Sequence, residues 1–163
     1  LLFLNYSLNS FADNPHFIDF TKVLNGSKSG SAAQKKLQDK FLIESKKFSK
    51  LQKDIKKEEI EIISQKKDVS AEEYKKKVEA LRKKVAKSQK DKQNSFNNIA
   101  KSRNDAKQKL VKAVNPIIKK YMEDNNIRIV VDKKSVVLGD TTLEITEQII
   151  TILNKELPAL KVN

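Results

Sequence analysis

Basic residues crowd one part of the sequence, on either side of a polar break at residues 66–72. Residues 35–92 hold 20 lysines or arginines against 11 acidic residues, and the whole chain has a net charge of +13. A local excess of one sign attracts oppositely charged partners and raises their rate of encounter. We therefore predict a surface nearest the break that binds anionic partners, made of Lys66, Lys67, Lys75, Lys76, Lys77, Arg82, Lys83 and Lys84.

Residues suited to catalysis are scarce. The chain has no cysteine, which excludes disulfides and thiolate metal sites. Its one histidine, His16, stands at the start of an expected strand, where we predict an exposed edge residue rather than a general base or ligand. The stretch NGSKSGS holds Gly26 and Gly30 but lacks the Gly-Lys-Ser/Thr of a phosphate loop, so we predict a flexible connector. We expect no enzyme activity, no cofactor and no metal.

Apolar residues at alternating steps of four and three indicate the helices that position these lysines. Neither proline nor glycine interrupts the chain from Ser31 to the break, so a helix of roughly 35 residues is predicted. The predicted seam, one residue wide, consists of Leu37, Phe41, Phe48, Leu51, Ile55 and Ile62, with Tyr74, Val78, Leu81 and Val85 from a second helix. Glu44 and Glu58 occupy the two polar seam positions of the first helix.

The second helix begins at a predicted capping box, in which Ser70 and Glu73 would satisfy each other's backbone amides. It reaches about Tyr121, with a kink expected at Pro116. The two helices should fold back as an antiparallel hairpin, an arm over residues 31–121 with its tip near 66–72. The seam thins between Ser88 and Ser95, and Phe96 is either part of a flexible waist or a core residue in a shifted register.

The two ends of the chain predict a small β head, residues 13–30 and 122–163. HFIDFTKVL reads as a strand running into a helical turn, and IRIVVDKKSVVL as two strands around a turn at residues 132–134. Thr141 or Thr142 should cap a last helix that Pro158 ends. Because three short strands are marginally stable alone, we predict an obligate oligomer. Its head residues are Ile18, Phe20, Ile129, Val131 and Val136.

Residues 1–12 carry no charge and end in Ser10, Phe11 and Ala12, as at a signal peptidase site. We interpret them as the remnant of a signal peptide, so that Asp13 begins a mature, exported chain. No run approaches the ~20 apolar residues of a membrane-spanning helix, and we therefore expect a soluble protein.

Three stretches together resemble the Skp/OmpH family of periplasmic chaperones. These are FIDFTKVLNGSKSGSAAQKKL at 17–37, IRIVVDKKSVVL at 127–138, and the charged helical hairpin between them. The resemblance implies an α+β homotrimer, in which strands from each subunit form a central barrel and three arms surround a cavity. It also implies an ATP-independent periplasmic holdase that binds unfolded outer-membrane proteins there. Anionic lipid and lipopolysaccharide headgroups are further candidate partners of the tip.

Two alternative functions stay open. The charge alone would suit a basic coiled-coil protein that binds nucleic acid. Against that, the arms carry few aromatics for base stacking, and residues 35–92 contain one arginine. A structural coiled coil of the envelope is the other alternative.

Overall fold

The structure, a computed structural model, describes residues 14–161 and is mostly helical. The predicted signal-peptide remnant and its cleavage site lie outside the described residues. The chain divides into two units. We call Ala32–Lys107 the arm, and the described residues 14–31 and Gln108–Leu160 the head. Helices α2 (Lys28–Ser64) and α3 (Ala71–Asp124) each contribute residues to both units.

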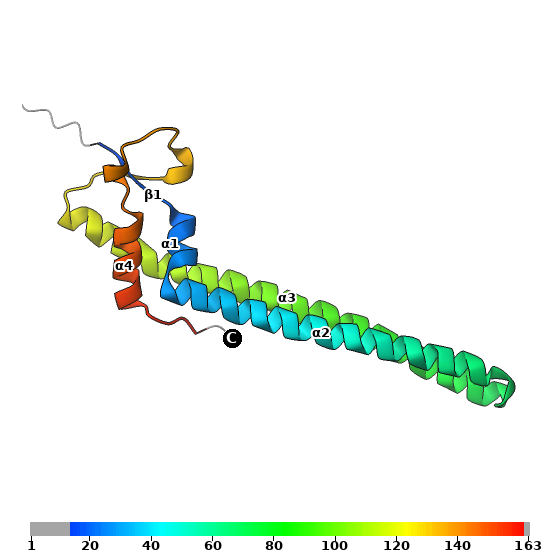
Figure 1. Ribbon diagram of the computed structural model, residues 1–163. Coiled ribbons are helices and arrows are strands. Elements are labelled where there is room, and N and C mark those ends of the chain that lie inside the picture. Colours follow the sequence, from blue (N-terminus) through cyan, green and yellow to red (C-terminus); the bar gives the residue numbers. More distant parts are fainter. Residues whose placement is uncertain (1–13, 162–163) are drawn as a thin grey trace, which may run out of the picture. The chain divides into compact units, whose positions relative to one another are not determined.

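In the arm, α2 and α3 lie side by side (Figure 1). Near one end of the arm, the rings of Phe41 and Phe96 are 5.2 Å apart, and further along α2, Glu58 forms an ion pair with Lys84. Residue numbers thus rise along α2 as they fall along α3, so the two helices run in opposite directions. The ring contact and the ion pair each join one helix to the other.

The connection between α2 and α3 is short. A 3-10 turn, η1 (Gln65–Lys67), follows α2, and α3 begins after Ser70. The Ser70 hydroxyl oxygen accepts a hydrogen bond from the Glu73 amide at 3.2 Å, which is one half of the predicted capping box. The Glu73 carboxylate lies 3.4 Å from the Lys77 ammonium.

The stretch around Gly26 and Gly30 is not the flexible connector that we predicted. Helix α1 (Phe20–Gly26) is separated from α2 by Ser27 alone. The Ser27 hydroxyl accepts from the Gly30 amide at 3.2 Å, and Ser27 is fully buried. A Cβ atom on Gly30 would stand 1.7 Å from the Leu24 carbonyl oxygen. Glycine therefore allows a tight helical corner here, where the sequence pattern suggested a loop.

Helix α3 passes through Pro116 and ends at Asp124, three residues beyond the predicted end near Tyr121. Asn126 has a φ of 56°, the left-handed conformation that commonly follows a helix. The Ile127 amide donates to the Met122 carbonyl at 2.9 Å, and the Asn126 amide donates to the Glu123 carbonyl at 3.4 Å. This pair of bonds is a Schellman motif, which satisfies carbonyls that the helix end would otherwise leave unpaired.

Two strands from opposite ends of the sequence form a small parallel sheet in the head. Strand β1 (His16–Ile18) pairs with β2 (Val130–Asp132), with His16 opposite Val130 and Ile18 opposite Asp132. His16 is half-buried, not exposed as we predicted, and its Nδ1 atom is buried without a hydrogen-bond partner among the described residues.

The second C-terminal strand that we predicted, at residues 136–138, is absent from this described part of the head. The Asp132 carboxylate accepts from the Lys134 amide at 2.9 Å and caps a 3-10 turn, η2 (Lys133–Ser135), which interrupts the extended chain. On the edge of β1 away from β2, Phe17 forms an isolated β-bridge with Glu144. The Phe17 carbonyl oxygen also accepts a hydrogen bond from the Ile145 amide at 3.0 Å. Residues 136–138 follow this turn without forming a strand.

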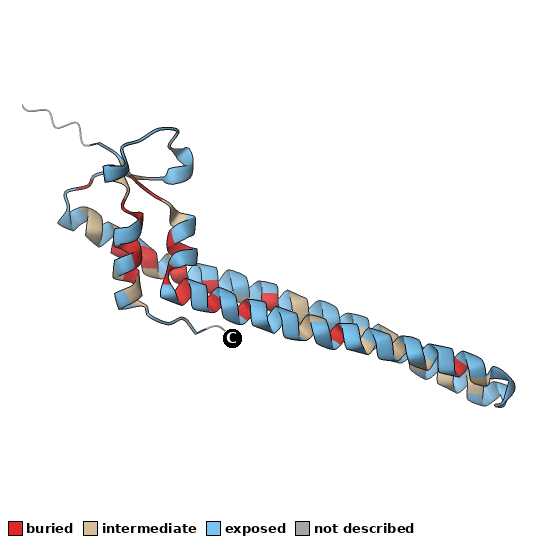
Figure 2. Cartoon of the chain, viewed as in Figure 1, coloured by how far each residue is buried: buried red, intermediate tan, exposed pale blue. Residues whose placement is uncertain are grey.

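Helix α4 (Thr146–Glu156) starts later than predicted. Asp140, not Thr141 or Thr142, caps the chain here, and it caps a separate 3-10 turn, η3 (Thr141–Leu143). Buried residues gather in the head and are widely spaced along the arm (Figure 2). The head core joins β1, α1, α4 and the last part of α3. It contains Ile18, Val23, Leu24, Leu110, Val114, Ile117, Ile127, Ile145, Ile149, Ile150 and Leu153.

Within residues 14–161, no helix combines the length and the apolar character needed to cross a membrane.

Candidate functional site: the surface of the arm

The predicted cationic cluster lies around the connection between α2 and α3. Lys66 and Lys67 belong to η1, and the other six cations belong to α3. All eight are exposed except Lys77, which is half-buried and donates to the Gln65 side-chain oxygen at 2.8 Å. The structure therefore brings the two sequence-separated groups of this cluster to the same end of the arm.

Acidic neighbours neutralise only part of this cluster. Lys76 pairs with Glu72 at 2.9 Å, and Lys84 pairs across the seam with Glu58. The Lys66 ammonium lies 5.9 Å from the centre of the Tyr74 ring, in cation–π geometry. Among the described residues, the cluster members that form no ion pair are Lys66, Lys67, Lys75, Arg82 and Lys83. These side chains leave a positive excess in solvent.

The seam residues differ in burial. Leu37, Phe48 and Ile62 are buried, whereas Phe41 is 41% exposed. The other predicted seam residues are half-buried, and they are Leu51, Ile55, Tyr74, Val78, Leu81 and Val85. A complete two-helix seam would cover such residues on both sides, so these six leave apolar surface accessible to solvent.

Phe96 belongs to the seam. Its ring lies 5.2 Å from Phe41 and 6.1 Å from Phe48, and α3 runs without interruption past it. These contacts favour the second of the two interpretations, a core residue in a shifted register. The preceding segment, Ser88 to Ser95, has no apolar side chain that would have indicated this contact from the sequence alone.

A polar pair lies within the seam beside these rings. The Glu44 carboxylate accepts from the Ser95 hydroxyl at 2.9 Å and from the Lys47 ammonium at 3.2 Å. The Ser95 hydrogen bond, followed by that from Lys47, lowers the pKa of Glu44. The carboxylate thus stays charged and joins the two helices at a position where an apolar residue would be expected.

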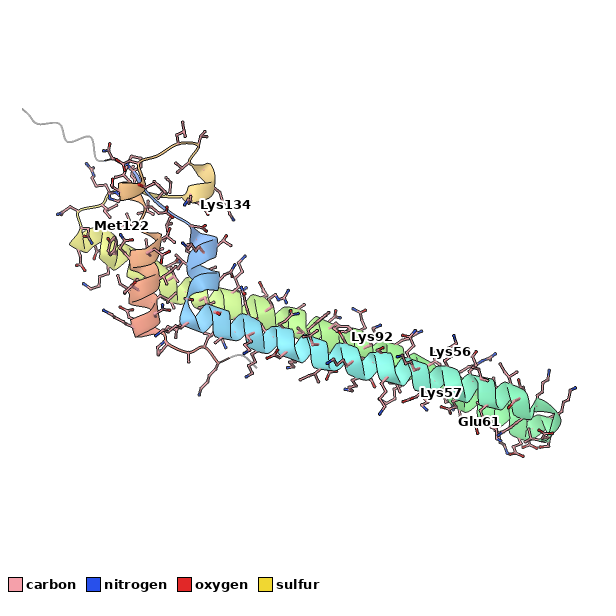
Figure 3. The ribbon with its side chains drawn as sticks, in the orientation of Figure 1. Lys56, Lys57, Glu61, Lys92, Met122 and Lys134 are labelled. Atoms are coloured by element: carbon pink, nitrogen blue, oxygen red, sulfur yellow. The ribbon has the colours of Figure 1, made fainter. Side chains whose placement is uncertain are left out.

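An open groove of about 880 Å³ runs along the arm, from Phe48 and Lys92 at one end to Ile62 and Tyr74 at the other. Its apolar lining comes from both helices and includes Ile55, Val78 and Leu81. Lys56 of α2 and Lys92 of α3 also line it (Figure 3). The sequence predicted the apolar residues and the charges, but not that the helices leave this space between them.

Further apolar side chains are exposed on α2, outside the predicted site. Leu42 and Ile43 follow Phe41 directly, and Ile60 and Ile63 flank the buried Ile62. The sequence indicates this exposure by placing apolar residues next to one another or two apart, since a seam one residue wide cannot cover all of them.

The predicted head residues fall into two groups. Ile18 is buried in the head core and Phe20 packs against it, whereas Val131 and Val136 are half-buried and Ile129 is 55% exposed. Val137 and Leu138, which we did not select, are almost fully exposed at 95% and 93%. The head therefore presents an apolar surface beside its two-stranded sheet.

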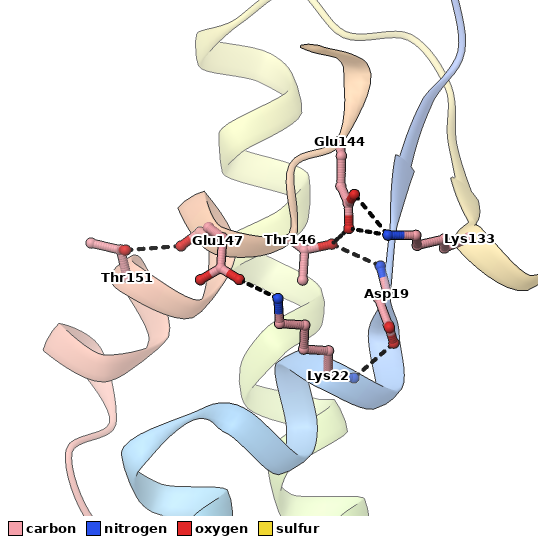
Figure 4. A network of polar contacts seen from close by, with 7 residues as sticks. All are labelled: Asp19, Lys22, Lys133, Glu144, Thr146, Glu147 and Thr151. Carbon is pink, nitrogen blue, oxygen red and sulfur yellow. Dashed lines mark hydrogen bonds and ion pairs between the residues drawn. The ribbon is translucent and has the colours of Figure 1, made fainter. Parts of the chain in front are cut away.

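A polar network fixes the start of α4 to β1 and α1 (Figure 4). The Asp19 amide donates to the Thr146 hydroxyl at 2.9 Å, and that hydroxyl donates to Glu144 at 2.8 Å. Lys133 lies 2.9 Å from Glu144, and this bond, with that from Thr146, lowers the pKa of Glu144. These contacts hold the start of α4 in place within the head. Within residues 14–161, no three acidic or histidine side chains gather as metal ligands would.

Known proteins resemble this chain in sequence and in structure. The family model "Outer membrane protein (OmpH-like)" matches residues 16–153. No match was found among curated proteins. The crystal structure of a candidate outer membrane chaperone (OmpH-like) from Caulobacter crescentus CB15 superposes with a TM-score of 0.84. That protein is 14% identical in sequence, and the alignment covers 92% of this chain and 90% of the other.

Proposed function

Since this chain belongs to the OmpH-like family of outer membrane proteins, a family with a chaperone role, we propose that it is an ATP-independent periplasmic holdase. Its clients would be unfolded outer-membrane proteins. The observation that carries this proposal is the arm, where half-buried apolar residues stand beside unneutralised lysines. Such a surface offers weak apolar contacts and a cationic field together, which suits transient binding of an unfolded chain.

Capture would begin with charge. The cations of the tip form a surface that attracts acidic segments over about a Debye length, roughly 8 Å at physiological ionic strength. Apolar contacts then follow, because strands of outer-membrane barrels present alternating apolar side chains. Lysine stems cover part of that apolar surface while their ammonium groups remain hydrated.

Holding would depend on many weak contacts. Several simultaneous contacts raise avidity through effective concentration, and each one can break without an energy source. Release to a folding partner therefore needs no nucleotide, in keeping with a chain in which we identified no nucleotide-binding motif.

Oligomer formation is part of the proposal. Exposed Ile129, Val137 and Leu138 and the short sheet of the head would be covered by further copies of the chain. The family resemblance implies three copies, with a β barrel in the centre and three arms around a client cavity. We propose residues 13–30 and 122–163 as the oligomer-forming part and 31–121 as the client-binding part.

Localisation follows from the proposed clients. An outer-membrane protein crosses the periplasm before it assembles, so its holdase must be exported as well. At the tip of the arm, anionic lipid or lipopolysaccharide headgroups would compete for the same lysines as acidic client segments.

The test is a dilution assay at physiological salt. An outer-membrane β-barrel protein unfolded in urea is diluted with and without the chain, and its aggregation is followed by light scattering. We expect suppression at near-stoichiometric oligomer. Suppression by a lysine-rich peptide of equal charge would contradict a specific holdase function, and so would the absence of suppression by the protein.

Nucleic-acid binding is the second candidate, because the net charge of +13 favours it. Retention of duplex DNA is measured in the same buffer. Tight binding that persists at raised salt, without suppression of aggregation, would reverse the ranking. A structural coiled coil of the envelope would show neither activity.

A further inference from the structure

The groove of the arm has an apolar floor that a two-helix seam leaves open. It extends along α2 from Phe48 to Ile62, and Val78 and Val85 face it from α3. Phe48 and Ile62 are buried at its ends, while Val78 and Val85 are half-buried. Apolar residues of both helices thus line one groove together.

The rim of the groove is polar and mostly cationic. Lys56, Arg82 and Lys92 line it, against the single acid Glu59. Among the described residues, none of these three cations forms an ion pair. Uncharged side chains complete the rim, namely Gln52, Ser88 and Gln89. An occupant with apolar side chains and flanking negative charges would complement both features.

The length of the groove sets the length of the occupant. The fourteen steps from Phe48 to Ile62 span about 21 Å at the rise of an α-helix. An extended chain advances about 3.3 Å per residue, so roughly six residues fit. An extended backbone also carries unpaired N–H and C=O groups, which the amides of Gln52 and Gln89 could satisfy. A helical occupant has no such need.

We propose that this groove binds one extended client segment of about six residues, apolar in alternation and flanked by Asp or Glu. The inference deepens the proposed function and rests on it: it assigns a binding site to each single arm, in addition to any space between arms. Each chain of an oligomer would then hold one such segment.

The experiment uses the full chain and a fluorescein-labelled peptide, Asp-Leu-Ser-Val-Thr-Phe-Glu, with binding measured by fluorescence anisotropy. The variant Lys56→Glu with Lys92→Glu reverses two rim charges. Its matched control, Lys57→Glu with Lys90→Glu, makes the same change in charge on the same helices, at residues that do not line the groove. Lys57 is labelled in Figure 3. We expect affinity to fall about tenfold in the rim variant and less than about twofold in the control.

A second pair of variants tests the space itself. Ala86 is exposed and lines the groove, so Ala86→Trp should obstruct it without disturbing the seam. Ala80→Trp is the control, since Ala80 is exposed on α3 but does not line the groove. Loss of peptide binding in Ala86→Trp alone supports the inference, and equal binding by both variants overturns it. Equal losses in the two charge variants would also overturn it.

Other occupants are distinguished by competition. Tighter binding of an acid-flanked peptide with a helical heptad pattern, or displacement of the labelled peptide by dodecanoate at lower concentration than by unlabelled peptide, would overturn the assignment.

The proposed function fails separately: it fails if the unaltered protein does not suppress client aggregation. If Ala86→Trp loses the peptide but suppresses aggregation fully, the groove exists as a site but is not the client site, and the inference is overturned while the function stands.

Discussion

The head and the arm bury apolar residues to different extents. In the head, Val23, Val114, Ile149 and Leu153 have no exposed surface, and four elements surround them. In the arm, two helices share one seam, and most of its residues keep a solvent-exposed side. A core enclosed from all sides gives stability and a fixed shape, whereas an open seam keeps apolar surface available for binding. Under the proposed function, the head would serve assembly and the arm would serve contact with clients.

The largest effect is expected from a cavity in the head. Ile149 is fully buried in α4, so Ile149→Ala should lower the free energy of unfolding by about 2–5 kcal/mol. Urea unfolding followed by circular dichroism measures the change. Ile43→Ala, at an exposed position of α2, is the control and should change it by less than about 0.5 kcal/mol. Similar losses in both variants would remove the distinction between the two regions.

The next effect concerns the seam. Replacing Phe48 and Ile55 with Ser removes one buried and one half-buried side chain, and we expect a loss of roughly 2–4 kcal/mol confined to the arm. Hydrogen exchange should speed up across residues 41–63, while sedimentation reports an unchanged oligomer. Dissociation of the oligomer would mean that the arms assemble it rather than the heads.

A smaller effect is expected at the tip. Charge reversal at Lys75, Lys76 and Lys77 replaces attraction with repulsion for acidic segments, so association with an unfolded client should slow by about tenfold at low salt. Stopped-flow fluorescence measures association and dissociation separately. Dissociation should change by less than about threefold, because charge steers encounter more than it holds the complex. Unchanged association kinetics would show that the tip does not receive the client.

The smallest effect is a pH dependence. The pKa of Glu44 is lowered in the folded arm by Ser95 and Lys47, so its carboxylate stabilises the fold above its ordinary pKa. That contribution is lost as pH falls below about 4.5 and through the lowered value. Unfolding free energies of the natural protein and of Glu44→Gln should therefore converge as the solution is acidified. Ser95→Ala should weaken the same dependence, and a constant difference across pH would refute it.

The arm was predictable from sequence because its information is local. Seven-residue spacing, the absence of proline and glycine between Ser31 and Ser70, and Ser70 as a cap each act within a few turns of helix. Both long helices lie within a few residues of the expected bounds. The head was less predictable. Residues 136–138 have strand-forming side chains but form no strand, and β2 pairs instead with β1, which lies 114 positions earlier in the chain. No local pattern contains that information.

The candidate site was predictable in composition but not in shape. Sequence indicates which residues are cationic and which belong to the seam. It does not indicate that Lys84 pairs with Glu58 while Lys83 has no ion-pair partner within residues 14–161, because that depends on the rotation of one helix against the other. The open groove likewise depends on the distance between helices. Gly30 was misread for a related reason, since its need for close approach to Leu24 appears only in three dimensions.

The pairing of β1 with β2 has a consequence for the order in which the molecule folds. His16 and Val130 are 114 positions apart in the chain, and everything between them must be synthesised before they can meet. Bringing such distant ends together from a random coil carries a substantial entropic penalty. Once α2 and α3 have formed and packed side by side, with the chain reversing near Ser70, the segment between β1 and β2 is no longer a random coil. The entropic penalty of pairing the two strands is then smaller. Early helix formation would therefore act as a template for the sheet, and a chain interrupted before residue 130 would leave β1 without its partner.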